Sequence, residues 1–282
     1  MKILQPVGRF LIYSNLFIAI CACLMVIQTF QLVLHLAPDP YLLGFIFFST
    51  ICSYSFHWWL SSEPTVTPSP RTSWQLKHKH LHLAFFVFGL IGAGIFFLYL
   101  IEYWIWLLPA VFITFLYSAP KIPDRRFRAL RKVAIGKTVF LTLVWTYVTA
   151  LLPLLVNEAR IETEGYLFTV SRFFFIYAIC ILFDYRDRED DRAKGIRSLI
   201  TFLSEKGIRN LFVLSLALFA IFTIALWWYG LPVLDIILIL LPGAIAAIAY
   251  PYATRRFSDL LYYFVLDGLM ALSSLLTIMT RI

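Results

Sequence analysis

Long runs of apolar residues alternate along this chain with short polar stretches. A helix needs about 20 predominantly apolar residues to cross a hydrocarbon layer of roughly 30 Å. Nine runs reach or approach this length, namely residues 10–36, 41–60, 81–101, 103–117, 133–156, 166–183, 211–228, 231–250 and 260–279. The fourth run is short and contains Pro109, so it is the weakest of the nine predicted spans.

The composition supports an integral membrane protein and excludes a water-soluble domain. Hydrophobic residues make up 61% of the chain and charged residues only 14%, whereas soluble domains are about half apolar and a quarter charged. No linker divides the sequence, so we predict one polytopic all-α membrane domain over residues 1–282, with nine transmembrane helices in a bundle. The four cysteines lie inside apolar runs without metal-type spacing and are interpreted as buried hydrophobes.

The Lys and Arg residues predict the orientation of the chain, because cytoplasmic loops retain positive charge. If the amino terminus and every second loop lie on one side, nearly all of the 24 Lys and Arg residues collect there. We therefore expect a cytoplasmic amino end, an external carboxyl end and a place in the bacterial inner (cytoplasmic) membrane. The net charge of +8 then marks a face in contact with membrane lipids, and no nucleic-acid partner is needed to explain it.

Polar residues gather in three predicted cytoplasmic stretches, 61–80, 118–132 and 184–210, so we expect any chemistry on that side. The last stretch contains Asp184, Asp187 and Asp191, whose spacing places them on one helix face within about 60° of one another. Hard oxygen ligands at the mouth of a membrane helix suit a Mg²⁺ ion that also binds a substrate phosphate. The alternative is a solvated, salt-bridged helix end, because four cations interleave with the acids: Arg186, Arg188, Arg192 and Lys194.

The segment DREDDRAKGIRS, residues 187–198, preceded by Asp184, resembles the second aspartate-rich motif of the UbiA-type membrane-embedded prenyltransferase superfamily. The end of the fourth run, YSAPK at residues 117–121, is similar to that family's Y-S/T-x-P element. The resemblance implies a nine-helix bundle around a central cavity with a polar cytoplasmic cap. It also implies that aspartates hold Mg²⁺ ions, that these ions bind a prenyl diphosphate, and that a lipophilic acceptor is alkylated.

Several residues take expected roles from the resemblance and from their positions. Asp184, Asp187 and Asp191 would be the catalytic groups that bind the metal. The residues expected to bind the substrate are Lys121, Arg71, Lys194, Arg197, Tyr117 and His57. Lys121 stands directly behind a span and is the best candidate for a phosphate contact, although the basic run 121–132 is also typical of simple lipid anchoring.

Histidines lie near the end of the second run and around the start of the third. The cluster HKHLH, residues 78–82, lacks the usual spacing of metal ligands and has no cysteine partner, so a cap that faces phosphate is the better interpretation. Arg71 is the best member of that cap. His57 stands next to Trp58 and Trp59, and the alternative to substrate binding is an interfacial histidine in an aromatic belt.

The sequence departs from the family pattern at the end of the second run. The family's first motif, N-D-x-x-D-x-x-x-D, is replaced there by CSYSFHWWLSS at residues 52–62, and no carboxylate follows until Glu63. One of the two metal sites is therefore missing or rebuilt. The chain could bind one Mg²⁺ and use cationic side chains for the remaining phosphate charge, or it could have lost the transfer reaction.

We predict an enzyme that transfers a prenyl group from a prenyl diphosphate, with Mg²⁺-assisted ionisation as its first step. Two alternatives stay open: an intramembrane terpene cyclase that needs no acceptor, and a non-catalytic isoprenoid-binding protein or small transporter.

Two charged residues lie within predicted spans, and the sequence predicts a different environment for each. Arg172 should extend outward to the external surface, whereas Asp267 should face a partner or a watered cavity.

Overall fold

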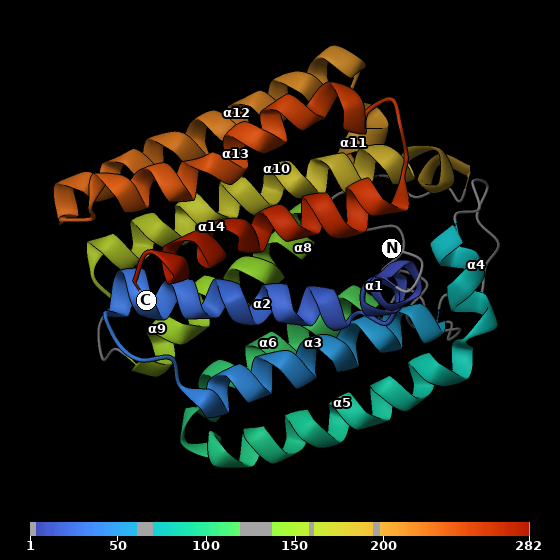
Figure 1. The fold of residues 1–282 in the computed structure, drawn as a ribbon, viewed down its shortest axis with the longest axis horizontal. Helices are drawn as coiled ribbons and strands as arrows, with labels where there is room; N and C mark the ends of the chain where they lie inside the picture. The colour runs from blue at the N-terminus through green and yellow to red at the C-terminus, as the bar shows by residue number, and fades with distance from the viewer. Residues whose placement is uncertain (1–3, 61–69, 119–136, 158–160, 194–197, 282) are drawn as a thin grey trace.

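The structure of the protein is a computed structural model that describes residues 4–60, 70–118, 137–157, 161–193 and 198–281. The described residues form helices joined by short connections, with no strand among them. The predicted all-α class is therefore confirmed. Figure 1 shows that most of the longer helices lie side by side along the long axis of a bundle.

The helices follow the chain in order. The first half contains α1 (Leu4–Tyr13), α2 (Leu16–Thr29), α3 (Pro40–Leu60), α4 (Pro70–Lys77), α5 (Lys79–Tyr99) and α6 (Trp104–Ser118). The second half contains α8 (Lys137–Thr146), α9 (Leu152–Asn157), α10 (Thr163–Ala193), α11 (Leu199–Phe202), α12 (Glu205–Ala225), α13 (Val233–Ala253) and α14 (Asp267–Met279). Short π-helical or 3-10 turns adjoin several of them: η1 (Phe30–Leu34), η2 (Ile101–Tyr103), η5 (Tyr147–Leu151), η6 (Leu226–Tyr229) and η7 (Leu261–Leu266).

Seven of the described helices are long and apolar enough to cross a membrane: Leu16–Leu34, Lys79–Tyr99, Thr138–Asn157, Thr163–Ala193, Glu205–Tyr229, Val233–Ala253 and Leu261–Met279. They correspond to seven of the nine predicted runs. The run at 103–117 forms α6, whose apolar stretch Ile101–Leu116 is shorter than a full span. The run at 41–60 forms α3, in which Ser, Thr and His side chains dilute the apolar ones. The helices thus support a polytopic membrane protein, while nine spans around a central cavity stay a prediction.

The first predicted run, residues 10–36, is not one helix. Asn15 has a left-handed backbone with φ 69°, which a right-handed helix cannot continue, so α1 ends at Tyr13 and α2 begins at Leu16. Asn tolerates this conformation better than most residues. In Figure 1, α1 is seen end-on while α2 runs along the bundle, so the amino-terminal helix lies across one end of the bundle.

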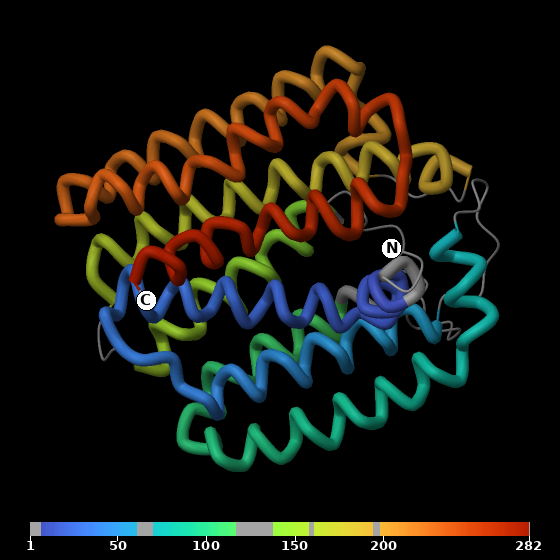
Figure 2. Tube along the Cα trace, in the orientation of Figure 1, coloured from blue at the N-terminus to red at the C-terminus, as the bar shows by residue number. Residues whose placement is uncertain are grey.

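α10 is the central helix of the bundle. Its residues 175–182 are all buried, and a helix that is apolar and buried on every side lies inside a protein. α12 packs along one side of α10 and α8 along another. α2 and α14, from opposite ends of the chain, lie side by side (Figure 2). The last turns of α10 therefore extend from the core to one end of the bundle.

Candidate functional site

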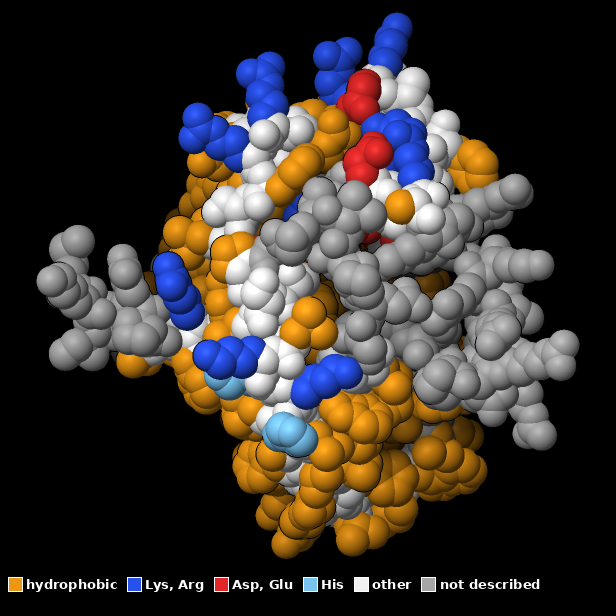
Figure 3. Space-filling model, turned by 90° about the vertical axis from the view of Figure 1, so that its right-hand side faces the viewer, with side chains coloured by type: hydrophobic (Ala, Val, Ile, Leu, Met, Phe, Trp, Pro, Cys, Tyr) orange, Lys and Arg blue, Asp and Glu red, His pale blue; other side chains and the backbone are white. Residues whose placement is uncertain are grey.

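Charged side chains gather at the end of the bundle where α10 finishes and where α4 and α11 lie (Figures 1 and 3). We call this the polar end. Figure 3 looks onto it and shows Lys, Arg, Asp, Glu and His side chains there, while the flanks of the molecule are mostly hydrophobic. Such a distribution separates a polar cap from a surface that suits lipid.

The three aspartates continue on α10 as regular helix, because α10 extends to Ala193. Asp184 and Asp191 are buried, with 5% of each residue exposed, whereas 36% of the Asp187 side chain is exposed. Asp184 accepts a hydrogen bond from the Thr138 hydroxyl of α8. Buried carboxylates at the end of a membrane helix are costly unless they bind cations or donors. Two of the three aspartates are therefore shielded from solvent, and their role in a metal site stays a prediction.

Salt bridges nevertheless surround the face, as the alternative interpretation predicted. Arg186 Nε lies 2.8 Å from Asp187 Oδ1. Arg192 pairs with Glu189 at 3.1 Å, and Arg188 pairs with Glu205 at the start of α12. Salt bridges at this helix end are therefore present beside the aspartates, and they do not by themselves decide between the two interpretations.

The donor set of α10 fits a Mg²⁺ ion that is shared with a substrate, but not one that the protein holds alone. In the described part of the chain, no group of three or more His, Cys, Asp or Glu side chains is arranged to hold a metal ion. Mg²⁺ in phosphate-binding sites is usually held by one or two carboxylates and completes its shell with water and phosphate oxygens. The buried Asp184 and Asp191 and the more open Asp187 supply that kind of oxygen ligand.

Two guanidinium groups lie on one tyrosine ring next to the acidic face. The Arg71 guanidinium carbon is 3.7 Å from the centroid of the Tyr263 ring, and that of Arg186 is 4.7 Å from the same centroid. Arg71 is buried and donates from Nη2 to Asn15 Oδ1 at 3.0 Å. Cation–π contacts reduce the cost of holding these charges away from water. Two fixed positive charges beside Asp187 make this corner suitable for a polyvalent anion.

Asp259 fixes the backbone around Arg71. Its Oδ2 accepts the Arg71 backbone N–H at 2.8 Å and the Tyr13 hydroxyl at 3.3 Å, which ties α4 and α1 to the segment before η7. Burial, together with the neighbouring Asp259 carboxylate, raises the pKa of Tyr13, so the hydroxyl stays a neutral donor. Asp267 begins α14 inside the apolar stretch Leu261–Met279, and its expected partner stays a prediction.

The structure brings five of the predicted site residues to the polar end: Asp184, Asp187, Asp191, Arg71 and His57, which is in the last turn of α3 beside Trp58. His57 lies on α3, half-buried, with its ring 5.9 Å from the Trp58 ring in an edge-on contact. Tyr117 belongs to the last turn of α6, and its side chain lies outside the described residues. Lys121, Lys194 and Arg197 also lie outside the described residues.

Arg172 does not extend to the external surface, so that prediction is wrong. Only 1% of the residue is exposed. Its Nη2 donates to the Met270 carbonyl at 2.8 Å and its Nη1 to Ser273 Oγ at 3.3 Å, both on α14. Acceptors inside the bundle therefore satisfy the guanidinium, and the sequence of one span could not reveal them.

Sequence reasoning missed Asn15 and Tyr263, which contact Arg71. Asn15 is a polar residue inside the first apolar run, and that interruption was the available signal. Tyr263 carries no signal, because tyrosines are expected near the ends of membrane helices in any case.

Comparisons with known proteins support one family. Residues 67–260 match the model of the UbiA prenyltransferase family. This segment includes Arg71 and the whole of α10 with its three aspartates, but not Asn15 or Tyr263. The comparisons with curated proteins and with solved structures found no match.

Proposed function

Because the chain belongs to the UbiA prenyltransferase family, we propose that it is a membrane-embedded enzyme that transfers a prenyl group from a prenyl diphosphate to a lipophilic acceptor. The observation that carries the proposal is the acidic face of α10 beside two guanidinium groups on the Tyr263 ring. Carboxylates that share a metal with phosphate, and cations that contact phosphate directly, are the two devices that bind a diphosphate.

In the proposed reaction, the bond between the allylic carbon and the diphosphate oxygen breaks, and its electron pair stays on the oxygen. The acceptor then forms a bond with the carbocation and loses a proton. Negative charge develops on the leaving diphosphate, and Arg71 and Arg186 are placed to stabilise it because their positions are fixed before the reaction. A Mg²⁺ ion bound to Asp184, Asp187 and Asp191 would supply further neutralisation of the diphosphate.

The surroundings of the two arginines also suit this chemistry. Arg186 lies 5.2 Å from the Phe183 ring centroid and 4.8 Å from that of Tyr262, and Arg71 lies 5.0 Å from that of Trp58. Aromatic walls keep water from a carbocation and tolerate positive charge. We place the polar end in the cytoplasm of a bacterial cell because positive residues are retained on that side of the inner membrane.

A second candidate, a non-catalytic isoprenoid-binding protein, is favoured by one observation. α3 contains no Asp or Glu between Pro40 and Leu60, so this helix supplies no metal ligand of that kind. A terpene cyclase would use the same diphosphate site without an acceptor. It differs from the proposed transferase in its product.

Ligand-induced stabilisation tests the proposal. We expect Mg²⁺ together with a prenyl diphosphate to raise the unfolding midpoint of the purified protein, because a ligand at one hundred times its Kd adds about 2.7 kcal/mol. Asp187→Ala should remove this shift. Glu189→Gln is the matched control, since Glu189 lies on the same helix and pairs only at the surface with Arg192.

Product analysis separates the candidates. Pyrophosphate release that requires an added acceptor supports the transferase, and release without an acceptor supports the cyclase. A midpoint shift without any release supports the non-catalytic protein. If the unfolding midpoint of the wild type did not rise, both the transferase and the cyclase proposals would be contradicted.

A further inference from the structure

Unpartnered polar atoms concentrate at the junction of α4 and α5. Arg71, Gln75 and His82 are 3%, 4% and 0% exposed. Arg71 Nε, both polar atoms of the Gln75 amide and both ring nitrogens of His82 are buried without a hydrogen-bond partner. Elsewhere in the described chain such atoms occur one per side chain, on Gln28, Gln31, Thr146 and Arg188.

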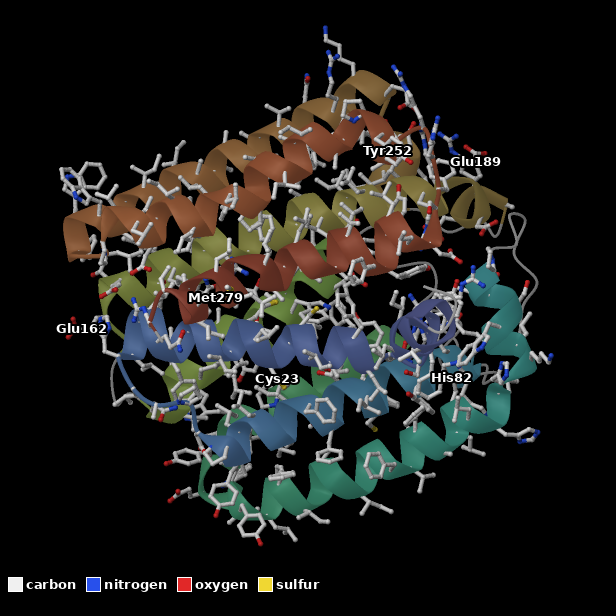
Figure 4. The ribbon with its side chains drawn as sticks, viewed as in Figure 1. Cys23, His82, Glu162, Glu189, Tyr252 and Met279 are labelled. Atoms are coloured by element: carbon white, nitrogen blue, oxygen red, sulfur yellow. The ribbon has the colours of Figure 1, made fainter. Side chains whose placement is uncertain are left out.

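These three side chains share one corner of the polar end. Arg71 and Gln75 are one turn apart on α4, with Trp74 on the same side of the helix. The Trp74 ring meets the His82 ring edge-on at 5.9 Å, which joins this face of α4 to the first turn of α5. Figure 4 labels His82 at the polar end, close to α4.

Leaving these atoms unpaired is expensive for the free protein. A buried donor or acceptor without a partner costs about 1–3 kcal/mol, and more than about nine in ten buried polar groups are paired in native structures. A group of them in one place indicates a ligand that completes them. The positive charge of Arg71 selects the kind of ligand, because it repels a cation and attracts an anion.

The hydrogen-bond donors of these three side chains also indicate an anionic ligand. Arg71 Nε–H, the Gln75 amide nitrogen and one nitrogen of the His82 ring can each donate to an oxygen. The Asp259 carboxylate next to them already accepts the Arg71 backbone N–H and the Tyr13 hydroxyl. Three free donors and the positive charge of Arg71 are the kinds of group that bind a phosphate oxygen.

We propose that Arg71, Gln75 and His82 form an oxyanion pocket that binds the terminal phosphate of a diphosphate directly, without a metal ion. The pocket rests on the proposed function and adds to it two binding residues, Gln75 and His82. α3 has no Asp or Glu that could hold a metal ion. The pocket would bind phosphate directly on that side of the polar end instead. The metal-dependent contacts of α10 and the metal-free contacts of this pocket then act on the same diphosphate.

Binding of inorganic pyrophosphate to the purified full-length protein in excess EDTA tests the pocket by calorimetry. We expect the wild type to bind, and Gln75→Met or His82→Phe to weaken binding about tenfold or more, because hydrogen bonds to charged groups are lost. The same two substitutions should raise the unfolding midpoint of the ligand-free protein, because they remove buried polar atoms that have no partner. His80→Asn, an exposed position on the same helix, should change neither quantity.

Several results would overturn the pocket. They are the absence of pyrophosphate binding to the wild type in EDTA, unchanged binding by both variants, or variants that are less stable or fail to fold. A merely structural role of Gln75 and His82 predicts that loss of stability.

A parallel titration with a prenyl diphosphate in EDTA separates substrate from released product, and both should lose affinity in the variants. The proposal of the pocket and the proposal of the enzyme can be contradicted separately. If pyrophosphate binds in EDTA but prenyl diphosphate with Mg²⁺ does not raise the unfolding midpoint, the pocket is supported and the enzyme is contradicted. If the midpoint rises but pyrophosphate does not bind in EDTA, only the enzyme is supported.

Discussion

Arg71 connects several elements of the polar end through one residue. Its side chain contacts Asn15 between α1 and α2, Trp58 on α3 and Tyr263 in η7, and its backbone binds Asp259. A planar guanidinium can donate hydrogen bonds at its edge while its face lies on an aromatic ring, which an ammonium group cannot do. Arg71 is therefore both a structural residue and a candidate phosphate ligand, and its substitution alone could not separate the two roles.

Substitutions at Asn15 test the left-handed turn separately from the hydrogen bond to Arg71. Asn15→Gly and Asn15→Ala both remove the oxygen that accepts from Arg71, but only alanine is strained at φ 69°. We expect the alanine variant to be about 1 kcal/mol less stable than the glycine variant in thermal unfolding. Equal midpoints would mean that the chain does not turn at Asn15.

Among the elements, the π-helical turn η7 carries the aromatic residues that contact the two arginines. Leu261, Tyr262 and Tyr263 are consecutive residues of this turn and all are buried. π-helical turns are frequent at functional sites. Here the turn supplies two adjacent tyrosines, Tyr262 and Tyr263, that both lie under the Arg186 guanidinium.

The packing of α3 against α5 gives a second prediction. A Cβ atom at Gly89 would lie 2.6 Å from the Cys52 nitrogen and 2.8 Å from the Phe48 oxygen, so Gly89→Ala must push the two helices apart. We expect a loss of about 1–3 kcal/mol in the free energy of unfolding, measured by thermal denaturation in detergent. Gly94→Ala is the control on the same helix, because a Cβ there meets nothing within 4 Å. A stable Gly89→Ala protein would contradict this close approach.

For the whole molecule, the distribution of charge predicts how the bundle sits in the membrane. The polar end carries Arg71 of α4 and the three arginines in the last turns of α10, and the opposite end carries Glu162 (Figure 4). Because Lys and Arg are retained in the cytoplasm, we predict that the polar end lies inside the cell. The proposed diphosphate site would face the compartment in which the soluble part of its substrate is available.

Labelling of intact cells with a membrane-impermeant maleimide tests that orientation. Glu162→Cys should be labelled from outside, whereas Lys77→Cys should react only after the cells are permeabilised. Both positions are exposed. The wild type is the background control, since its four cysteines lie within helices and are buried or half-buried. If Lys77→Cys were labelled in intact cells, the polar end would lie outside the cell, and the predicted topology would be wrong.

The sequence by itself determined the helical membrane class, seven of the predicted spans and the acidic face of α10, because each depends on residues close together in the chain. Hydrophobic length and helical spacing are local properties. Only the tertiary structure decided that α1 turns across the bundle, that Arg172 is buried against α14, and that Asn15, Arg71, Arg186 and Tyr263 meet. Those contacts join elements far apart in the sequence, and their geometry depends on how whole helices pack rather than on any one segment.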